Sequence, residues 1–141
     1  MDSPLLLGTL TVPGAAENVA EARRFLMKLL GGDHRDAETV KLLLSELMGN
    51  SIRHSASGRG GLVTVAVLDV EGALRVEVAD GGGPTVPCLC ARGELVESGR
   101  GMKLVDVMAS RWGFVRDPVE GGTTWFELGG TWAPLSRRRD P

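Results

Sequence analysis

The chain has 141 residues, of which 43% are apolar, 24% charged and 4% aromatic, so it is long enough for one compact domain and too short for two ordinary ones. Its 16 basic and 18 acidic side chains give a net charge of −2, which argues against nucleic acid as a direct partner. The apolar stretches are far shorter than the ~20 residues that span a bilayer, and the N-terminal leucines lack the basic region of a signal peptide, so we expect a soluble, cytoplasmic protein with no membrane partner.

The N-terminal part of the chain predicts a strand and then a helix. Residues 5–12 carry β-branched side chains in their second half and stop at Pro13, which is typical of a strand, here an edge strand. From 15 to 30 the apolar residues recur every three or four positions, and Gly31-Gly32 follows them. This spacing predicts a first helix.

A second helix is predicted to begin after Asp33 or Asp36, either of which can cap it, and to run to about His54. One set of its side chains falls within about a quarter-turn at 100° per residue. These side chains are Val40, Leu43, Leu44, Leu47 and Ser51. We expect this stripe to face the core.

A hairpin and a long loop follow. Residues 62–68 and 74–79 read as two strands, and Glu71-Gly72 between them predicts a tight connection. Residues 81–98 contain glycines and prolines and show no sustained periodicity. Long loops of this kind in compact domains are usually lids, binding loops or disordered segments.

The C-terminal part predicts one more helix and two more strands. Apolar residues at near-helical spacing predict the helix over 99–110. Residues 111–116 and 123–128 read as strands around a Gly121-Gly122 turn.

The resulting order, β-α-α-β-β-loop-α-β-β, contains no internal repeat. Three helices can cover one face of about five strands in a mixed or antiparallel sheet, so we expect a two-layer α/β sandwich, of the α+β kind. Residues 1–130 are predicted to form this single domain, and the basic tail 131–141 is predicted to be disordered.

A carboxylate and an amide share one flank of the second predicted helix. Glu46, Asn50 and Arg53 are separated by four and three residues, which places them on one stripe beside the apolar one. Gly49, next to Asn50, costs about 1 kcal/mol of helix stability relative to alanine, so this stretch sacrifices local stability. The alternative interpretation is an ordinary solvated polar face.

A second carboxylate ends the strand 74–79. Side chains two residues apart in a strand lie on the same face, so Asp80 is predicted to share the face of Val76 and Val78. This places a carboxylate on a face that is otherwise apolar. A ligand amine could supply the hydrogen bond that a buried carboxylate requires, and the three glycines after Asp80 would let a flat ring lie against bare backbone. The alternative is that Asp80-Gly81 simply starts a turn.

A third candidate site lies where the last helix is predicted to open. Backbone N–H groups at a helix N-terminus, with Gly99 and Gly101 allowing close approach and Arg100 and Lys103 adding positive charge, form an anion site that suits phosphate. The spacing is not that of a Walker loop, so on this evidence the phosphate site is a candidate only.

Taken together, these motifs resemble those of a known superfamily. Four segments match the N, G1, G2 and G3 boxes of the GHKL ATPases and kinases, in order: Glu46-x-x-x-Asn50-x-x-Arg53-His54, Asp80-x-Gly82, Gly99-Arg100-Gly101 and Gly122-Thr-Thr124. The resemblance covers about residues 10–128. Within the superfamily, the short chain and the form Glu-Leu-x-x-Asn-x-x-Arg-His-Ser look most like the anti-sigma-factor serine/threonine kinases of the sporulation and stress-response type, which many actinobacterial regulators resemble.

The resemblance implies a Bergerat-type ATP-binding fold that holds ATP and Mg²⁺ under a lid, here residues 81–98. Carried over residue by residue, Glu46 would be the catalytic base and Asn50 the magnesium ligand. Phosphoryl transfer depends on charge neutralisation and positioning, and these two residue types suit it.

The resemblance also implies the nucleotide contacts. Asp80 would accept a hydrogen bond from the adenine amino group, Gly82 would give the base room, and Thr124 would lie near the adenine. The phosphates would be held by Gly99, Arg100 and Gly101.

The function implied is an ATP-binding anti-sigma factor that sequesters a sigma factor and phosphorylates an anti-anti-sigma antagonist, with a homodimer as the expected assembly. Arg23 and Arg24 on the first helix invite comparison with partner-binding arginines of these regulators. The alternative is a non-catalytic docking module that binds nucleotide weakly or not at all. The altered lid, with Pro84 in place of the second glycine of the G1 box and the free thiols of Cys88 and Cys90, counts for that alternative, and the intact catalytic residues count against it.

Overall fold

A computed structural model of the chain describes residues 4–31, 36–54, 61–80, 96–117 and 121–129. In chain order, these residues form β1 (Leu5–Pro13), α1 (Glu17–Leu30), α2 (Ala37–His54), β2 (Leu62–Val70), β3 (Ala73–Asp80), α3 (Val96–Met108), β4 (Arg111–Asp117) and β5 (Gly121–Leu128). All eight predicted elements are present, and most of their ends fall within two or three residues of the prediction. Asp36 directly precedes α2, which is the position expected of it as one of the two predicted N-terminal caps of this helix.

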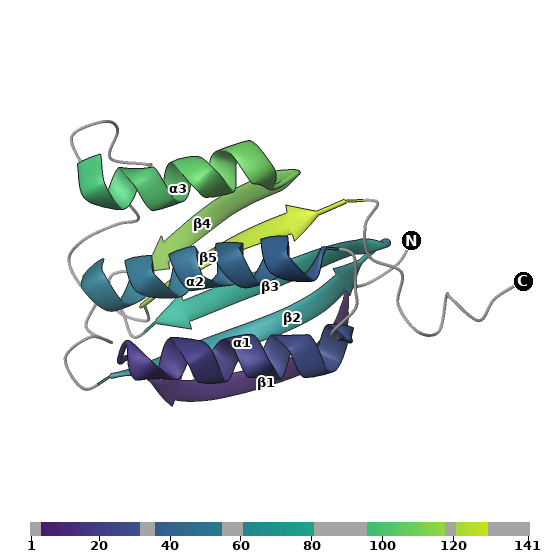
Figure 1. The fold of residues 1–141 in the computed structure, drawn as a ribbon, viewed down its shortest axis with the longest axis horizontal. Coiled ribbons are helices and arrows are strands. Elements are labelled where there is room, and N and C mark those ends of the chain that lie inside the picture. Colours follow the sequence, from purple (N-terminus) through teal and green to yellow (C-terminus); the bar gives the residue numbers. More distant parts are fainter. Residues whose placement is uncertain (1–3, 32–35, 55–60, 81–95, 118–120, 130–141) are drawn as a thin grey trace, which may run out of the picture.

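The five strands form one sheet in the order β1-β2-β3-β5-β4 (Figure 1). All four pairings are antiparallel, so a mixed sheet is wrong and the antiparallel alternative is confirmed. Two pairings, β2 with β3 and β4 with β5, join neighbours along the chain, which short connections make antiparallel. β5 lies between β3 and β4, and β1 is an edge strand, as predicted.

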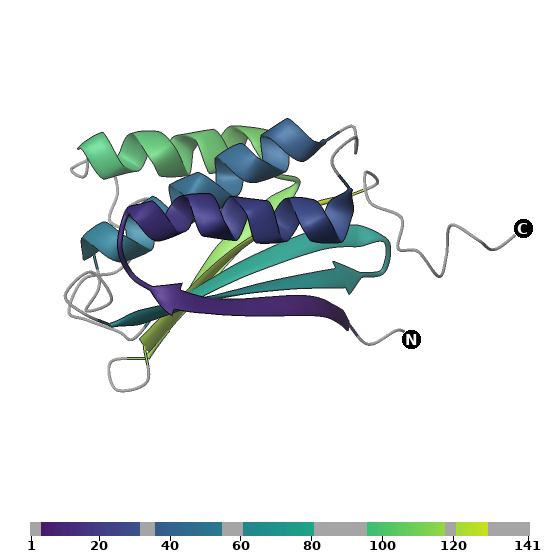
Figure 2. The same cartoon turned by 60° about the horizontal axis from the view of Figure 1, so that its bottom comes forward.

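The three helices lie on one face of the sheet (Figure 2), which confirms the two-layer sandwich. α2 is the central helix and packs against α1, α3 and strand β3, while α1 packs on β1 and α3 on β4. The largest fully buried side chains come from this interface: Phe126, Leu26, Leu43, Leu44, Leu47, Met48, Leu74 and Met102. The predicted core stripe of the second helix, from Val40 to Ser51, is buried throughout. No helix in the described part of the chain combines the length and the apolar character needed to cross a membrane.

Helix α3 begins at Val96, three residues before the start predicted at Gly99. Gly99 therefore lies inside the helix and does not open it. The glycines are accommodated inside the helix at a moderate cost. Residues 96–98 therefore belong to the helix, while 81–95 of the predicted lid lie outside the described residues.

The β2–β3 hairpin turns through Glu71 and Gly72, which both have positive φ angles, 54° and 88°. This is the backbone of a type I′ turn, whose twist matches that of the flanking strands. The carboxylate of Asp69 accepts a hydrogen bond from the Gly72 N–H at 2.9 Å. The predicted connection is confirmed, with a glutamate in a conformation that side chains rarely adopt.

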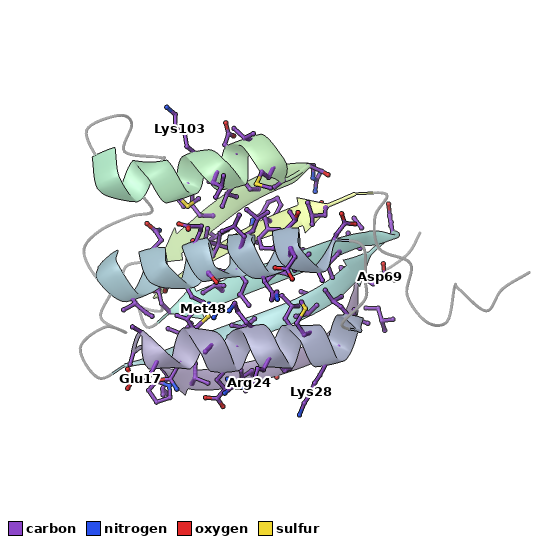
Figure 3. The ribbon with its side chains drawn as sticks, in the orientation of Figure 1. Glu17, Arg24, Lys28, Met48, Asp69 and Lys103 are labelled. Carbon is purple, nitrogen blue, oxygen red and sulfur yellow. The ribbon has the colours of Figure 1, made fainter. Side chains whose placement is uncertain are left out.

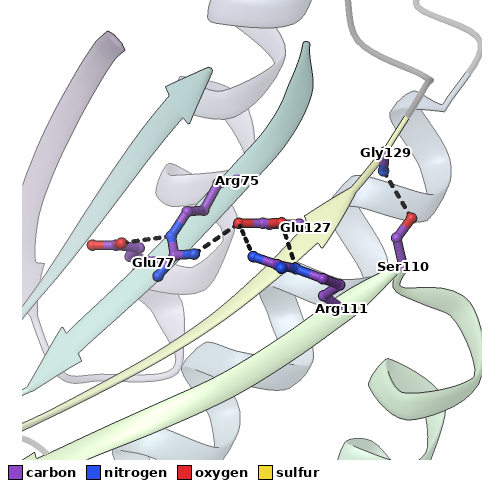
Figure 4. A network of polar contacts seen from close by, with 6 residues as sticks. All are labelled: Arg75, Glu77, Ser110, Arg111, Glu127 and Gly129. Atoms are coloured by element: carbon purple, nitrogen blue, oxygen red, sulfur yellow. Dashed lines mark hydrogen bonds and ion pairs between the residues drawn. The ribbon is translucent and has the colours of Figure 1, made fainter. Parts of the chain in front are cut away.

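The sheet face turned away from the helices carries a cluster of charges (Figure 4). Glu127 is 5% exposed, and its carboxylate accepts hydrogen bonds from Arg75 at 2.7 Å and from Arg111 at 3.0 Å. Arg75 also contacts Glu77 at 2.7 Å and stacks on the ring of Trp125, 3.8 Å from its centre. These side chains pair their charges and hydrogen-bonding groups with one another. They lie on the face of β3, β5 and β4 that is turned away from the helices.

Candidate functional site

The site is built around Asp80, the last residue of β3. Leu74, Val76 and Val78 of this strand are buried on the helix-facing side, and the alternation of a strand carries the same phase onto Asp80. The Ser51 hydroxyl donates a hydrogen bond to Oδ2 of Asp80 at 2.9 Å, which shows that Asp80 does point toward α2. The Gly122 N–H donates to Oδ1 at 3.3 Å. Each carboxylate oxygen thus has a donor, one from a helix and one from a neighbouring strand.

The C-terminal half of α2 supplies the second part of the site. Asn50 is 4% exposed and Ser51 is 7% exposed, while Glu46, one turn earlier, is half-buried. A solvated polar face is therefore wrong for Asn50, whose amide is enclosed by the fold. Because a buried amide carries a desolvation penalty, its position beside the Ser51–Asp80 contact indicates a polar site at the end of α2.

Strand β5 supplies the third part. Its register pairs Thr124 with Val78 and Thr123 with Ala79, so Thr124 lies on the helix-facing side next to the strand that ends in Asp80. Thr124 is 8% exposed. The structure therefore brings three of the predicted residues, Asn50, Asp80 and Thr124, to the same end of the sandwich, where α2, β3 and β5 meet.

The predicted phosphate-binding residues lie on α3, but not where the sequence placed them. The free N–H groups of a helix are those of its first turn. Because α3 begins at Val96, Gly99, Arg100 and Gly101 follow that turn and do not open the helix. The expectation of an anion site at a helix N-terminus formed by these three residues is wrong in this respect, and their contact with phosphates stays a prediction.

Some predicted site residues lie outside the described residues. Gly82 is one of them, together with Pro84, Cys88 and Cys90 of the lid. Their proposed roles stay predictions. Arg53 belongs to the last turn of α2.

Sequence reasoning missed two participants. Ser51 belongs to the predicted core stripe of α2, and Gly122 belongs to the segment that matches the G3 box, yet both donate hydrogen bonds to Asp80. The signal for Ser51 was available, because it is the one polar side chain in an otherwise apolar predicted stripe. The Gly122 contact depends on the pairing of β3 with β5, which no local pattern reveals.

A basic groove lies on the helical layer, away from this site. This basic groove is the surface between α1 and α2. Its lining holds four basic side chains and one acidic one, together with small and apolar neighbours: Arg23, Arg24, Lys28, Lys41, Glu38, Ala20, Met27, Leu42 and Ser45. Arg24 and Lys28 project from α1 (Figure 3). Arg23 donates to the Ser45 hydroxyl at 3.2 Å, and Lys41 pairs with Glu38 at 3.0 Å. The groove is positively charged in a chain whose net charge is −2.

A comparison with protein families shows the family to which the chain belongs. Residues 12–126 match the model of the histidine kinase-like ATPase domain. The chain belongs to this family. Membership implies ATP as the nucleotide and, typically, Mg²⁺ with it. A comparison with proteins of curated function gives no match.

A solved structure supports the same fold. The chain is similar to the histidine kinase domain of the blue-light activated histidine kinase from Erythrobacter litoralis EL346, with a TM-score of 0.52 and 20% sequence identity. The similarity covers 90% of this chain and 63% of that chain. At this identity the likeness shows the shared fold alone, and the family rests on the match over residues 12–126.

The residues present fit a magnesium nucleotide. Asp80 offers acceptors to an amino group, and Asn50 offers an amide oxygen, which is a suitable ligand for Mg²⁺. In the described ranges, no group of three or more His, Cys, Asp or Glu side chains is placed to hold a metal. In nucleotide sites, Mg²⁺ is usually held by the phosphates and by one or two protein oxygens, so a single amide oxygen from the protein is a sufficient ligand.

Proposed function

We propose that this histidine kinase-like ATPase domain is an ATP-binding regulatory protein: an anti-sigma factor with serine/threonine kinase activity that phosphorylates an anti-anti-sigma antagonist with Mg-ATP. One observation carries the nucleotide part of the proposal. The Asp80 carboxylate is held by Ser51 and Gly122 at the point where buried Asn50 and Thr124 also lie.

At the adenine end, Asp80 is an acceptor for the 6-amino group. A carboxylate oxygen that already accepts one hydrogen bond retains a lone pair for another. A site that meets an N–H donor with a fixed acceptor rejects bases that present an acceptor there, because two acceptors are then left unpaired. Thr124, buried beside the same strand end, adds a hydroxyl near the base.

At the phosphate end, Asn50 and Glu46 lie one turn apart on α2. Asn50 would hold the magnesium ion, which when bound neutralises the charge of the phosphates. Glu46 is half-buried and would accept the proton of the attacking serine or threonine hydroxyl. A positioned base of this kind contributes about 10²- to 10⁴-fold to a rate.

The basic groove supports the partner part of the proposal. Its arginines and lysines, with Met27 and Leu42 beside them, suit an acidic, partly apolar surface of another protein. The groove includes Arg23 and Arg24, for which the resemblance to anti-sigma kinases suggested a partner role. A sigma factor or an antagonist with such a surface is the proposed occupant.

The same groove favours a second candidate function, a docking module without catalysis. Because the groove lies on the α1–α2 surface and not at the Asp80 site, it could hold a partner whether or not phosphoryl transfer takes place. The two functions differ in whether Glu46 is needed.

Calorimetric titration with ATP, with and without Mg²⁺, tests the nucleotide part. We expect binding by the native chain that depends on magnesium and is weakened by about 100-fold or more in Asp80→Asn. Absence of ATP binding by the native chain would refute the kinase and leave the docking module.

Transfer of labelled phosphate from ATP to a purified anti-anti-sigma protein of the same organism tests the catalytic part. We expect Glu46→Ala to reduce transfer by at least about 100-fold and to bind ATP as the native chain does. Glu17→Ala, which removes an exposed glutamate of α1, is the matched control and should transfer normally. Equal rates for Glu46→Ala and the native chain would contradict the role of Glu46.

A further inference from the structure

We propose that Ser51 is a positioning residue for purine selectivity: its hydroxyl holds the Asp80 carboxylate in the orientation that accepts a hydrogen bond from a 6-amino purine. The inference rests on the proposed nucleotide binding and adds to it a residue whose role is neither packing nor direct chemistry.

The first support is the place of Ser51 in the fold. It follows Leu44 and Leu47 on the buried stripe of α2, and it is itself 7% exposed. A buried hydroxyl requires a partner, because desolvation without a hydrogen bond is unfavourable. Its oxygen lies 2.9 Å from Oδ2 of Asp80, which is a well-formed bond to a charged acceptor. Such bonds are stronger than those between neutral groups.

The second support is the geometry of the carboxylate. The last torsion of an aspartate side chain is broad and has no sharp staggered preference, so the plane of a free carboxylate is poorly determined. Here one oxygen accepts from Ser51 and the other from the Gly122 N–H at 3.3 Å. Two donors on two different elements define the plane, and of the two contacts the Ser51 bond is the shorter.

A carboxylate with a defined plane can discriminate between purines. Its remaining lone pairs point in fixed directions, so a 6-amino group can donate to one of them. A 6-oxo purine places an oxygen there instead and leaves two acceptors facing each other. Without Ser51, the carboxylate loses the shorter of these two contacts and keeps the longer one from Gly122, so its plane is less well defined. We therefore expect the preference for the amino group to weaken more than the binding of the rest of the nucleotide.

The experiment compares ATP with inosine triphosphate, which carries the same ribose and phosphates but a 6-oxo base. For Ser51→Ala we expect ATP to bind about 3- to 10-fold more weakly, the range for loss of one hydrogen bond. Binding of inosine triphosphate should change by less than about twofold. The selectivity ratio, which is the affinity for ATP divided by the affinity for inosine triphosphate, therefore falls with the ATP affinity. Ser51→Thr retains the hydroxyl and should restore most of the ratio.

Two further variants separate positioning from structure. Ser45→Ala removes a serine six residues earlier on the same helix, whose hydroxyl donates to the Lys41 carbonyl at 2.9 Å, and it should leave both affinities unchanged. In an Asp80→Asn background, Ser51→Ala should have no further effect on the ratio, because the residue acts through Asp80.

The outcomes are distinct. A parallel loss of ATP and inosine triphosphate binding in Ser51→Ala, or an unchanged ratio, would overturn the positioning role and leave the nucleotide site intact. No binding of ATP by the native chain would overturn the proposed function and this inference with it. A loss of selectivity that Ser51→Thr restores and Ser45→Ala does not reproduce would support it.

Discussion

Two carboxylates on neighbouring strands of the same sheet have different surroundings. Glu127 on β5 faces away from the helices, is 5% exposed, and is held by the guanidinium groups of Arg75 and Arg111. Asp80 at the end of β3 faces the helices, is more exposed, and is held by a hydroxyl and a backbone N–H. Positive charges compensate Glu127 inside the fold, whereas the hydrogen bonds of Asp80 orient it. The guanidinium partners of Glu127 give it a structural role, whereas the neutral donors around Asp80 suit the recognition role that we propose for it.

The largest expected effect belongs to Asp80→Asn. We expect ATP affinity to fall by about 100-fold or more, because the amide places a donor where an acceptor is needed. The free energy of unfolding should change by less than about 1 kcal/mol. Calorimetry and urea denaturation measure the two quantities. A large loss of stability with normal ATP affinity would assign to Asp80 the role we give to Glu127.

Glu127→Gln is the converse test. Removing one member of a buried charge network is strongly destabilising, but Arg111 remains largely in solvent, so we expect about 2 kcal/mol of lost stability. ATP affinity should stay within about twofold of the native value. Urea denaturation measures the loss. Glu77→Gln is the control, since Glu77 is more exposed and contacts Arg75 alone in this network, and it should cost less than about 1 kcal/mol.

Gly113→Ala tests the packing beneath the charge cluster. A Cβ at Gly113 would lie 2.8 Å from Cζ2 of Trp125, so the ring on which Arg75 stacks must move. We expect a loss of about 1–2 kcal/mol, as for other overpacked sites. Gly129→Ala is the matched control, because the nearest atom to its Cβ is 3.6 Å away on Ser110. Thermal denaturation of both variants should show a lower midpoint for Gly113→Ala alone.

The smallest expected effect is a gain at the β2–β3 hairpin turn, at the opposite end of β3 from Asp80. Glu71 has a φ of 54°, and asparagine adopts this region more readily than glutamate. Glu71→Asn also creates the Asn-Gly pair preferred in type I′ turns, so we expect about 0.5 kcal/mol of added stability. Thermal denaturation checks the sign. A destabilised variant would show that the Glu71 side chain has a role the backbone does not reveal.

Much of the fold was predictable because its signals are local. The helices were found from apolar spacing and the strands from β-branched runs, and the alternation in β3 placed Asp80 on the helix-facing side. The buried stripe of α2 was predicted down to Ser51. The start of α3 was not, because glycine marks helix ends only on average, and a glycine inside a helix carries a cost that packing can offset.

Local sequence patterns suffice for the helices and strands, the family motifs and the direction in which Asp80 points, because each of these depends on residues close together in the chain. Three features emerge only from the folded domain: β5 lies between β3 and β4, Asn50 is buried, and Ser51 and Gly122 both donate to Asp80. The Asp80 contacts join residues 29 and 42 positions apart. Pairings at such separations depend on strand order and helix packing over the whole domain, which no local periodicity encodes.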